Sequence, residues 1–254
     1  MSAAHEQNAF PGVTTKMLAP KVDKVMLAMP EAKQYLKLKA EPIVTGNPVR
    51  EAVIHADRKT ARKALGLDDR PFILSFGGSL GARPINESVA ALMAWHWKEG
   101  KYYHYHAAGK AGFDTMKALL KEKGVKLDKA PAIRMTEYIN DMDLCMAAAD
   151  LCICRAGAIT LSELQVQGKA SILIPSPYVA ENHQYHNAMT LKNKGAAQVI
   201  EEKDLTGERL VEEVSRLLHD PSALSAMGDN AKKSAVLDVN ERIYSVIMEL
   251  FSVR

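Results

Sequence analysis

Short apolar runs alternate with longer segments of helical periodicity along most of this chain. They predict strands at 72–76, 102–107, 132–135, 151–154, 171–174 and 197–200, and helices at 58–65, 84–97, 113–123, 142–149, 161–167 and 182–192. Strands that are apolar at nearly every position are typical of a parallel sheet covered by helices on both faces. The pattern therefore predicts an α/β fold with a doubly wound, Rossmann-like domain over roughly residues 46–235.

The two ends of the chain fall outside this alternation. Near the amino end, 23–28 and 43–45 each predict a short strand, and the second runs into Gly46-Asn47-Pro48, which we interpret as a hinge. We expect no element before the polar stretch that begins at His5. Near the carboxyl end, 240–250 predicts an amphipathic helix that could fold back onto the amino-terminal piece. The chain is therefore divided into residues 1–46, 47–236 and 237–254.

Composition narrows the class of protein. With 47% hydrophobic and 25% charged residues, the 254-residue chain is typical of a folded globular protein. A net charge of +3 is too small to indicate nucleic-acid binding over the whole surface. The three cysteines are an odd set without metal-ligand spacing, which favours a reducing compartment over a disulfide framework. No apolar run approaches the ~18 residues of a membrane span and no signal pattern opens the chain, so we expect any membrane contact to be peripheral.

The first candidate site is the loop Gly77-Gly78-Ser79-Leu80-Gly81-Ala82, between a predicted strand and a predicted helix. In an open parallel sheet, ligands bind beyond the carboxyl ends of the strands. Glycines let the backbone approach a phosphate, the N–H groups and the helix dipole favour an anion, and Ser79 can donate a further hydrogen bond. The spacing matches neither the dinucleotide fingerprint nor the P-loop. The alternative is a tight turn that uses glycine for geometry alone.

The second candidate loop runs from Cys154 to Glu163 and also enters a helix. Glu163 lies about one turn into that helix, where a carboxylate could accept both hydroxyls of a ribose. Arg155 could neutralise phosphate charge. Taken alone, a carboxylate that merely favours the helix dipole is the commoner case, so this alternative stays open.

The third candidate loop follows the predicted strand 171–174. His183, Gln184 and Asn187 cluster within about one helical turn and offer imidazole and amide groups suited to sugar hydroxyls. A polar, solvated helix start is an equally good alternative. His183 and His186 share a helix face poorly and lack a third ligand, so no metal site is predicted. Asn140-Asp141-Met142-Asp143 is similar to a metal-binding D-x-D motif, but at a helix start these residues are more simply a cap and first-turn acids.

Six stretches together resemble one family, the MurG-type N-acetylglucosaminyltransferases, which add the second sugar to lipid I in bacterial peptidoglycan synthesis. In the family's order and spacing they are HEQNAFPGVTTKMLAP, GNPVR, ILSFGGSLGA, TEYINDM, CRAGAITLSELQVQGKASILIP and NHQYHNA. Each stretch alone is weak, but their joint occurrence is highly specific. The resemblance implies a two-domain GT-B fold and inverting transfer of GlcNAc from UDP-GlcNAc to the 4-hydroxyl of MurNAc in lipid I, without a cofactor.

The resemblance also assigns ligand contacts. The matching donor-site positions are Asn8, Arg50, Gly78, Ser79, Ile139, Arg155, Ala158, Ile159, Thr160, Leu161, Ser162, Glu163, His183, Gln184 and Asn187. By that match Arg50 and Ser79 approach the phosphates, and the backbone of Ile139 contacts uracil. Glu163 contacts the ribose and Gln184 the sugar. Asn8 is the implied donor contact from the amino-terminal domain.

One part of the family pattern is not found. The family begins with a glycine-rich loop ending in a histidine that is proposed to serve the acceptor, and we expect roughly this first third to be missing. Residues 1–46 would then be a remnant of the acceptor domain, 47–236 the UDP-GlcNAc-binding domain, and 237–254 a helix packed back on the amino-terminal part. The general base stays unassigned, with His5 and Glu6 as candidates that face the cleft.

The implied partners are UDP-GlcNAc, undecaprenyl-linked lipid I and the cytoplasmic face of the bacterial cell membrane, where the protein would dock peripherally. Lysines that could attract anionic lipid, or simply form a solvated face, are Lys16, Lys21, Lys24, Lys33, Lys37 and Lys39. Two alternatives remain. One is a UDP-sugar-binding subunit that is inactive without a separate chain supplying the amino-terminal domain, and the other is a UDP-GlcNAc epimerase.

Overall fold

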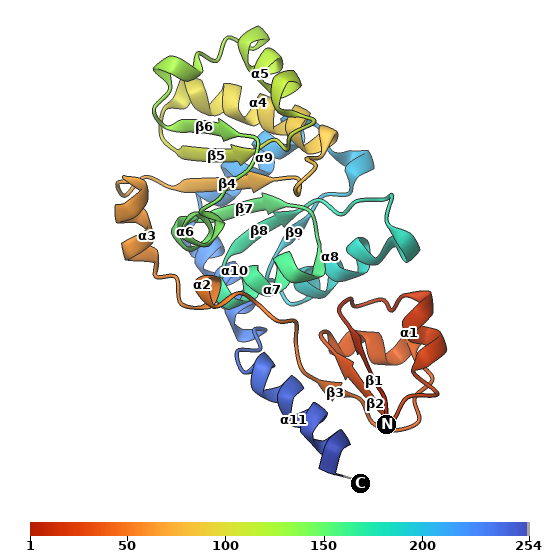
Figure 1. Ribbon diagram of the computed structural model, residues 1–254. Coiled ribbons are helices and arrows are strands. Elements are labelled where there is room, and N and C mark those ends of the chain that lie inside the picture. Colours follow the sequence, from red (N-terminus) through yellow and green to blue (C-terminus); the bar gives the residue numbers. More distant parts are fainter. Residues whose placement is uncertain (253–254) are drawn as a thin grey trace.

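The computed structural model describes residues 1–252, and within them the strands form two parallel sheets (Figure 1). The smaller sheet has the order β1-β2-β3 and the larger sheet the order β6-β5-β4-β7-β8-β9. The strands are β1 (Ala3–Glu6), β2 (Lys24–Leu27), β3 (Ile43–Val44), β4 (Phe72–Phe76), β5 (Tyr103–Ala107), β6 (Ile133–Thr136), β7 (Leu151–Cys154), β8 (Ala170–Leu173) and β9 (Gln198–Val199). The predicted α/β class is confirmed.

Helices cover both faces of the larger sheet. The α-helices are α1 (Val13–Leu18), α2 (Glu51–Ile54), α3 (Arg58–Leu65), α4 (Arg83–Glu99), α5 (Phe113–Glu122), α6 (Met142–Ala148), α7 (Ala158–Gln167), α8 (His183–Asn193), α9 (Gly207–Leu218), α10 (Pro221–Lys233) and α11 (Val239–Ser252). Short 3-10 turns are η1 (Pro30–Tyr35), η2 (Leu127–Lys129), η3 (Ala180–Asn182) and η4 (Glu202–Asp204). Alternate strand residues serve opposite faces: Ile73 packs in the core with α4, α5 and α9, and Leu74 in the core with α3, α6 and α7. This explains the continuous apolar strands.

Polar residues set several helix ends. The Asp57 carboxylate accepts the N–H of Thr60 at 2.8 Å, and α3 ends at Gly66 in the left-handed conformation, with a φ of 70°. Asp220 caps α10 in the same way, accepting the N–H of Ala223 at 2.9 Å. Such caps fix the bounds of α3, which agree with the bounds predicted from the sequence.

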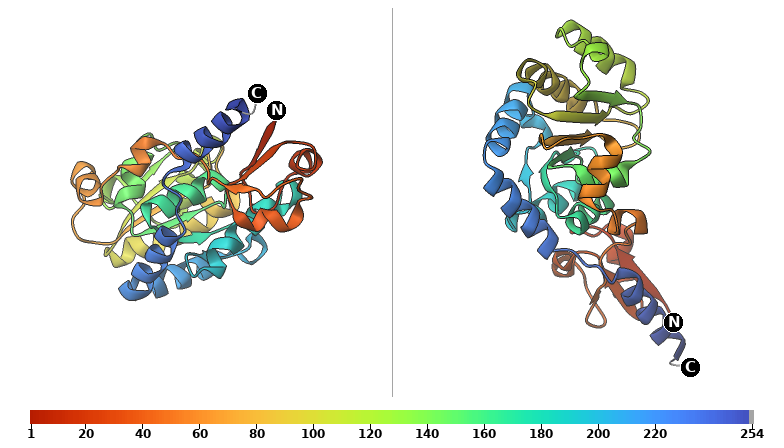
Figure 2. Two further views of the ribbon diagram at one scale, coloured as in Figure 1. Left: turned by 90° about the horizontal axis from the view of Figure 1, so that it is seen from below. Right: turned by 90° about the vertical axis from the view of Figure 1, so that its left-hand side faces the viewer.

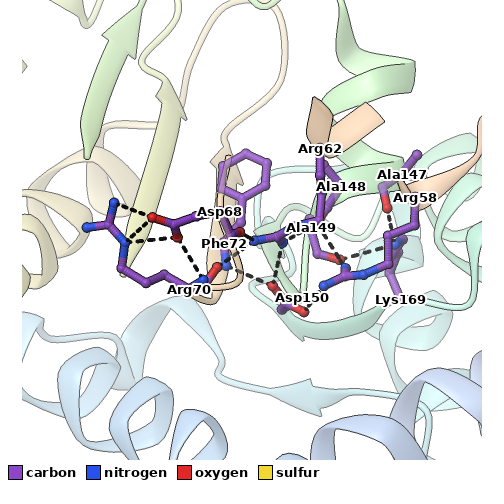
Figure 3. Close-up of polar contacts among 10 residues, drawn as sticks. All are labelled: Arg58, Arg62, Asp68, Arg70, Phe72, Ala147, Ala148, Ala149, Asp150 and Lys169. Atoms are coloured by element: carbon purple, nitrogen blue, oxygen red, sulfur yellow. Dashed lines mark hydrogen bonds and ion pairs between the residues drawn. The ribbon is translucent and has the colours of Figure 1, made fainter. Parts of the chain in front are cut away.

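A set of charged side chains, which we call the amino-edge cluster, lies where β4, β7 and β8 begin (Figure 3). It consists of Arg58, Arg62, Asp150 and Lys169. Asp150 pairs with Arg58 at 2.6 Å and Arg62 at 3.3 Å, and accepts the N–H of Phe72 at 2.8 Å. Lys169 donates to two carbonyls at the end of α6, at 2.6 and 3.1 Å, and burial lowers its pKa to about 8. The cations therefore cap the negative end of a helix dipole.

The smaller sheet and α11 lie beside each other, with the two ends of the described chain on the same side of the molecule (Figure 2). Lys24 on β2 pairs with Glu249 of α11 at 2.9 Å, and Arg242 donates to the Val44 carbonyl at 3.0 Å. The chain crosses between the two sheets at Gly46, whose φ is +78°. A Cβ there would lie 2.9 Å from the Val236 side chain, on the returning segment. Glycine is therefore required where the two crossings touch.

The expectation that no element precedes His5 was wrong. Ala3–Glu6 forms β1, which pairs in parallel with β2. The strand is short and polar, with one fully buried residue, so it lacks the apolar run that predicts a buried strand. Within residues 1–252, no helix is both long and apolar enough to cross a bilayer.

Candidate functional site

The loops after β4 and β5 cross at the carboxyl edge of the larger sheet. A Cβ on Gly81 would lie 2.2 Å from the Ala108 carbonyl oxygen, and one on Gly109 would lie 2.2 Å from the Gly81 nitrogen. Glycine is therefore required at positions 81 and 109 partly because the two loops touch there. This agrees in part with the alternative interpretation, in which the loop uses glycine for geometry alone. Gly78 and Ser79 form an exposed tip, with a φ of +94° at Gly78, and remain accessible to an anion.

Helix α7 begins at Ala158 rather than at the predicted residue 161. The first-turn residues Ala158, Ile159 and Thr160 therefore present N–H groups without partners in the helix, which favour an anion at this end. Leu161 is fully buried and holds the helix against the core. Ser162 donates to the Ala158 carbonyl at 3.1 Å, inside the same turn. The first turn thus supplies backbone donors rather than side-chain charge.

Glu163 lies on the second turn of α7 and is 9% exposed. Its carboxylate is 3.4 Å from the guanidinium of Arg50, which precedes α2 and whose side chain is 58% exposed. Burial raises the pKa of Glu163, and the nearby Arg50 opposes that shift. An ion pair with a long contact of 3.4 Å and one exposed partner is weak. Both groups can therefore exchange this pairing for contacts with a ligand.

Arg155 lies at the same edge but faces inward. Its guanidinium pairs with Glu202 and donates to the Ile174 carbonyl at 3.1 Å, and both members of the pair are largely buried. The expectation that Arg155 neutralises phosphate gains no support from this geometry, because its charge is already balanced within the fold. The residue instead joins the loops that follow β7 and β8.

At the start of α8 the loop is tightened by Glu181 and Asn182, which adopt positive φ angles of 57° and 48°. The Gln184 side-chain oxygen accepts the N–H of Ser176 at 2.9 Å, so its amide nitrogen is the end that can face a ligand. His183 donates from Nδ1 to the Ala180 carbonyl at 2.9 Å, since a carbonyl can only accept. In the neutral ring, its Nε2 is then an acceptor.

Asn187 corrects the sequence interpretation, because its side chain is fully buried and its amide is already bonded. The oxygen accepts the N–H of Ala9 at 2.8 Å, and the nitrogen donates to Asn8 at 3.0 Å and to the Ala156 carbonyl at 3.2 Å. Direct sugar contact would require breaking these bonds. Asn187 therefore ties the loop after β1 to the loop after β7.

The two candidate bases also differ from expectation. Glu6 does not face a cleft: it is 3% exposed and accepts N–H groups from Asn8 at 3.0 Å and Gly12 at 3.2 Å. It shapes the loop that carries Asn8. His5 is half-buried, and its Nε2 lies 3.0 Å from the Gly46 carbonyl, to which it must donate. Neither geometry provides a free base.

The loop after β6 contains Ile139, which is buried as a whole residue. The loop is held by the N–H of Gly109, which donates to the Glu137 carbonyl at 3.0 Å. Its neighbour Tyr138 is 61% exposed. The contact of the Ile139 backbone with uracil therefore stays a prediction of the resemblance.

Among residues 1–252, no group of three or more histidine, cysteine, aspartate or glutamate side chains is placed to hold a metal ion. The three cysteines are buried, and burial raises the thiol pKa values of Cys145 and Cys152 to about 12. Such thiols are protonated and are poor ligands or nucleophiles. The hydrogen-bond donors available to a ligand at the carboxyl edge are therefore backbone and side-chain amides, the hydroxyl of Ser79 and the guanidinium of Arg50.

Asn47 lies at the site, although it was not among the candidate site residues predicted from the sequence. Its amide nitrogen donates to the Gln7 carbonyl at 3.2 Å and to Ser162 at 3.3 Å, so it joins the loop after β1 to α7. Its sequence signals were its place in the predicted hinge Gly46-Asn47-Pro48 and in the stretch GNPVR of the family resemblance, and neither indicated a partner.

A doubly wound sheet with a glycine loop, a helix start and a buried carboxylate after its strands is the architecture typical of nucleotide-binding domains. The family model for the glycosyltransferase family 28 C-terminal domain matches residues 72–243, and the chain belongs to this family.

Two relatives have the same name, UDP-N-acetylglucosamine–N-acetylmuramyl-(pentapeptide) pyrophosphoryl-undecaprenol N-acetylglucosamine transferase. The protein from Acetivibrio thermocellus is 47% identical over 97% of this chain, and that from Caldanaerobacter subterraneus is 41% identical over 96%. The chain spans 66% of the length of each.

Solved structures agree on the fold. MurG of Acinetobacter baumannii superposes with a TM-score of 0.78 at 26% identity, over 97% of this chain and 66% of that one, which confirms the GT-B type. A proposed UDP-N-acetylglucosamine 2-epimerase from Listeria monocytogenes gives a TM-score of 0.70 at 15% identity, over 99% of this chain and 68% of that one. At that identity the likeness concerns the fold alone, so it lends the epimerase alternative no functional support.

Proposed function

We propose that this chain carries the donor half of an inverting glycosyltransferase that moves GlcNAc from UDP-GlcNAc to the 4-hydroxyl of MurNAc in lipid I, giving lipid II. The observation that carries the proposal is the pairing of Arg50 with Glu163 near the start of α7, the helix that follows β7. Each is a weakly held, oppositely charged group at the edge where nucleotides bind in this fold. The related transferases named above act on the same two substrates by name.

In this proposal UDP-GlcNAc displaces the Arg50–Glu163 pairing. Glu163 accepts the ribose hydroxyls, and Arg50 turns to the diphosphate together with the backbone at Gly78 and the hydroxyl of Ser79. The backbone of Ile139 contacts uracil. Gln184 donates its amide to the sugar, which is consistent with its oxygen being held by Ser176.

The chemistry is a single displacement. The acceptor hydroxyl attacks the anomeric carbon opposite the departing UDP, so the bond to the diphosphate oxygen breaks as the new bond forms. UDP leaves as an anion, and in this proposal the N–H groups at the start of α7 and in the glycine loop face that charge. The general base is left unassigned, because Glu6 and His5 are both bonded elsewhere.

We further propose the domain division 1–46, 47–236 and 237–254, which is supported by the separate sheets and by the contacts of α11 with β2 and β3. The acceptor is a membrane lipid, so the complete enzyme would act peripherally at the cytoplasmic face of the cell membrane. A separate chain supplying further acceptor-domain residues would be an additional partner.

The test is calorimetric titration of the purified chain with UDP, UDP-GlcNAc and, as a negative control, NAD. We expect saturable binding of the first two and none of NAD. Absence of UDP binding by the folded chain would overturn the proposal.

Product analysis then separates the remaining functions. Transfer to lipid I by the chain alone supports a complete enzyme, and transfer only after addition of a second chain supports a binding subunit. Epimerised sugar nucleotide in the absence of lipid would identify an epimerase instead.

A further inference from the structure

A chain of hydrogen bonds runs through the core between the larger sheet and α4, where neighbouring side chains are apolar. It joins His104, Ser75, His106 and Asn86, each at most 5% exposed, and ends at the Ala108 carbonyl. The four bonds measure 2.7 Å from His104 Nε2 to Ser75 Oγ, 2.8 Å from Ser75 Oγ to His106 Nδ1, 3.1 Å from His106 Nε2 to Asn86 Oδ1, and 2.9 Å from Asn86 Nδ2 to the carbonyl.

The direction of each bond follows from its end point. The Ala108 carbonyl can only accept, so Asn86 donates its nitrogen there and turns its oxygen to His106. His106 must then carry its proton on Nε2. In a neutral ring its Nδ1 is bare and accepts the single hydroxyl proton of Ser75, which in turn accepts from Nε2 of His104. The remaining atom, His104 Nδ1, is then a bare acceptor, and it is buried without a partner in the described chain.

The alternative tautomer, in which His106 Nδ1 donates to the Ser75 carbonyl at 3.1 Å, is disfavoured at the far end of the chain. Each neutral tautomer sets one pair of acceptors 3.1 Å apart: Nδ1 and the Ser75 carbonyl in the first, Nε2 and the Asn86 oxygen in the second. In the second, Ser75 must direct its proton to His104 Nε2, so His104 would hold its own proton on Nδ1, and a buried N–H without a partner is rarer than a bare acceptor. A doubly protonated ring would satisfy both contacts, but burial lowers the pKa of His106 to about 4, so the ring is neutral near pH 7.

The chain of bonds ends at the glycine loop. The Ala108 carbonyl oxygen would be 2.2 Å from a Cβ on Gly81, and the Asn86 amide nitrogen would be 2.2 Å from a Cβ on Gly112. Both loops therefore rest on the last two members of the chain. Because a buried polar chain is stabilising only when every member is oriented, a change at its far end is transmitted to the loops.

We propose that His104, Ser75, His106 and Asn86 are positioning residues that hold the crossed loops 77–82 and 108–112 in the shape that receives the donor diphosphate. None of the four contacts the ligand. We call this chain of hydrogen bonds the relay. The identity of the ligand rests on the proposed function, and the relay rests on the hydrogen-bond geometry.

The relay is tested first without any ligand. In protein labelled with ¹⁵N-histidine, NMR distinguishes the two ring nitrogens, and we expect His104 and His106 both to carry the proton on Nε2 at pH 7. A proton on Nδ1 of His106 would overturn the relay. This measurement uses the unmodified chain, so it does not depend on a variant that folds.

The effect on the loops is tested with Ser75→Ala, which removes the central link. His96→Phe is the matched control, because His96 is also buried beside His104 but makes no ring hydrogen bond in the described chain. We expect Ser75→Ala, and not His96→Phe, to shift the backbone amide resonances of 77–82 and 108–112 and to weaken UDP binding about tenfold. Ser75→Thr, which keeps the hydroxyl, should restore affinity to within about threefold.

Equal effects of Ser75→Ala and His96→Phe on the loop resonances would reduce the relay to ordinary core packing and overturn the proposal. If unmodified protein fails to bind UDP, the proposed function fails, while the tautomers and the loop resonances still decide the relay.

Discussion

The two edges of the larger sheet carry similar charged residues but satisfy them differently. At the amino edge, Asp150, Arg58 and Lys169 are bonded to one another or to main-chain groups within the fold (Figure 3). At the carboxyl edge, Arg155 and Glu202 are satisfied in the same way, whereas Arg50 and Glu163 share one long contact of 3.4 Å. A charge that the fold already satisfies stabilises structure, and a charge left under-satisfied is available to a ligand.

The sharpest test of this comparison is Asp150→Ala. Removing this carboxylate takes the carboxylate partner from Arg58 and Arg62 and the acceptor from the Phe72 N–H. We therefore expect the free energy of unfolding to fall by about 3 kcal/mol, at the low end for a buried pair because Asp150 is partly exposed. UDP affinity should stay within about twofold. Urea denaturation and calorimetry measure the two quantities, and Asp229→Ala, an exposed acid on α10, is the control.

The converse test is Glu163→Ala. We expect UDP affinity to fall about 30-fold, since hydrogen bonds to a charged group are worth about 1.5–3 kcal/mol. Stability should not decrease, because burial already disfavours the charged carboxylate. Glu208→Ala, a first-turn carboxylate of α9, should leave UDP affinity unchanged. Equal behaviour of the two variants would mean that Glu163 serves only the helix dipole.

A smaller effect is expected for Arg50→Ala. In the proposal the guanidinium reaches the diphosphate from an exposed position. Its loss should therefore weaken the binding of UDP about tenfold and leave the binding of uridine nearly unchanged. The exposed Arg209→Ala controls for net charge. Comparable losses for UDP and uridine would place Arg50 away from the phosphates.

A pH titration of UDP affinity sharpens the role of Glu163 further. The pKa of this carboxyl is raised, so the group protonates at a higher pH than an ordinary glutamate and stops accepting two hydroxyls. We expect affinity to fall as pH is lowered, beginning above pH 4.5, the ordinary value. Glu163→Gln should lose this part of the dependence and keep the part due to the nucleotide phosphate.

The smallest expected effect is that of metal removal. Fixed N–H groups supply the positive potential in the proposed site, so dialysis against EDTA should change UDP affinity by less than about twofold. A large loss that magnesium restores would place a metal at the carboxyl edge and contradict the proposed donor set.

The fold was largely predictable because its strands and helices repeat one signal. Strands such as β4 and β7 are buried at every position, and α3 carries its own cap and stop residues. The strand β1 was not predictable in this way, because its stability comes from pairing with β2 and from the buried Glu6, neither of which leaves an apolar pattern.

The site was predictable as a set of loops but not as a set of roles. Glu163 and Ser79 lie where the sequence placed them. Asn187 and Arg155 carry the residue types expected of ligand contacts, yet their partners, Ala9 and Glu202, are distant in sequence and became visible only in the fold. Residue type fixes what a side chain can bond, and tertiary structure decides which partner it meets.

The chain passes between its two sheets twice, and the two passages touch at Gly46 and Val236. A single connection would leave the angle between the two sheets to one set of backbone dihedrals. With two connections in contact, neither can rotate without displacing the other. Asn8 and Asn47 join the two parts again through Asn187 and Ser162, so a change in the angle between the sheets has to break these bonds together.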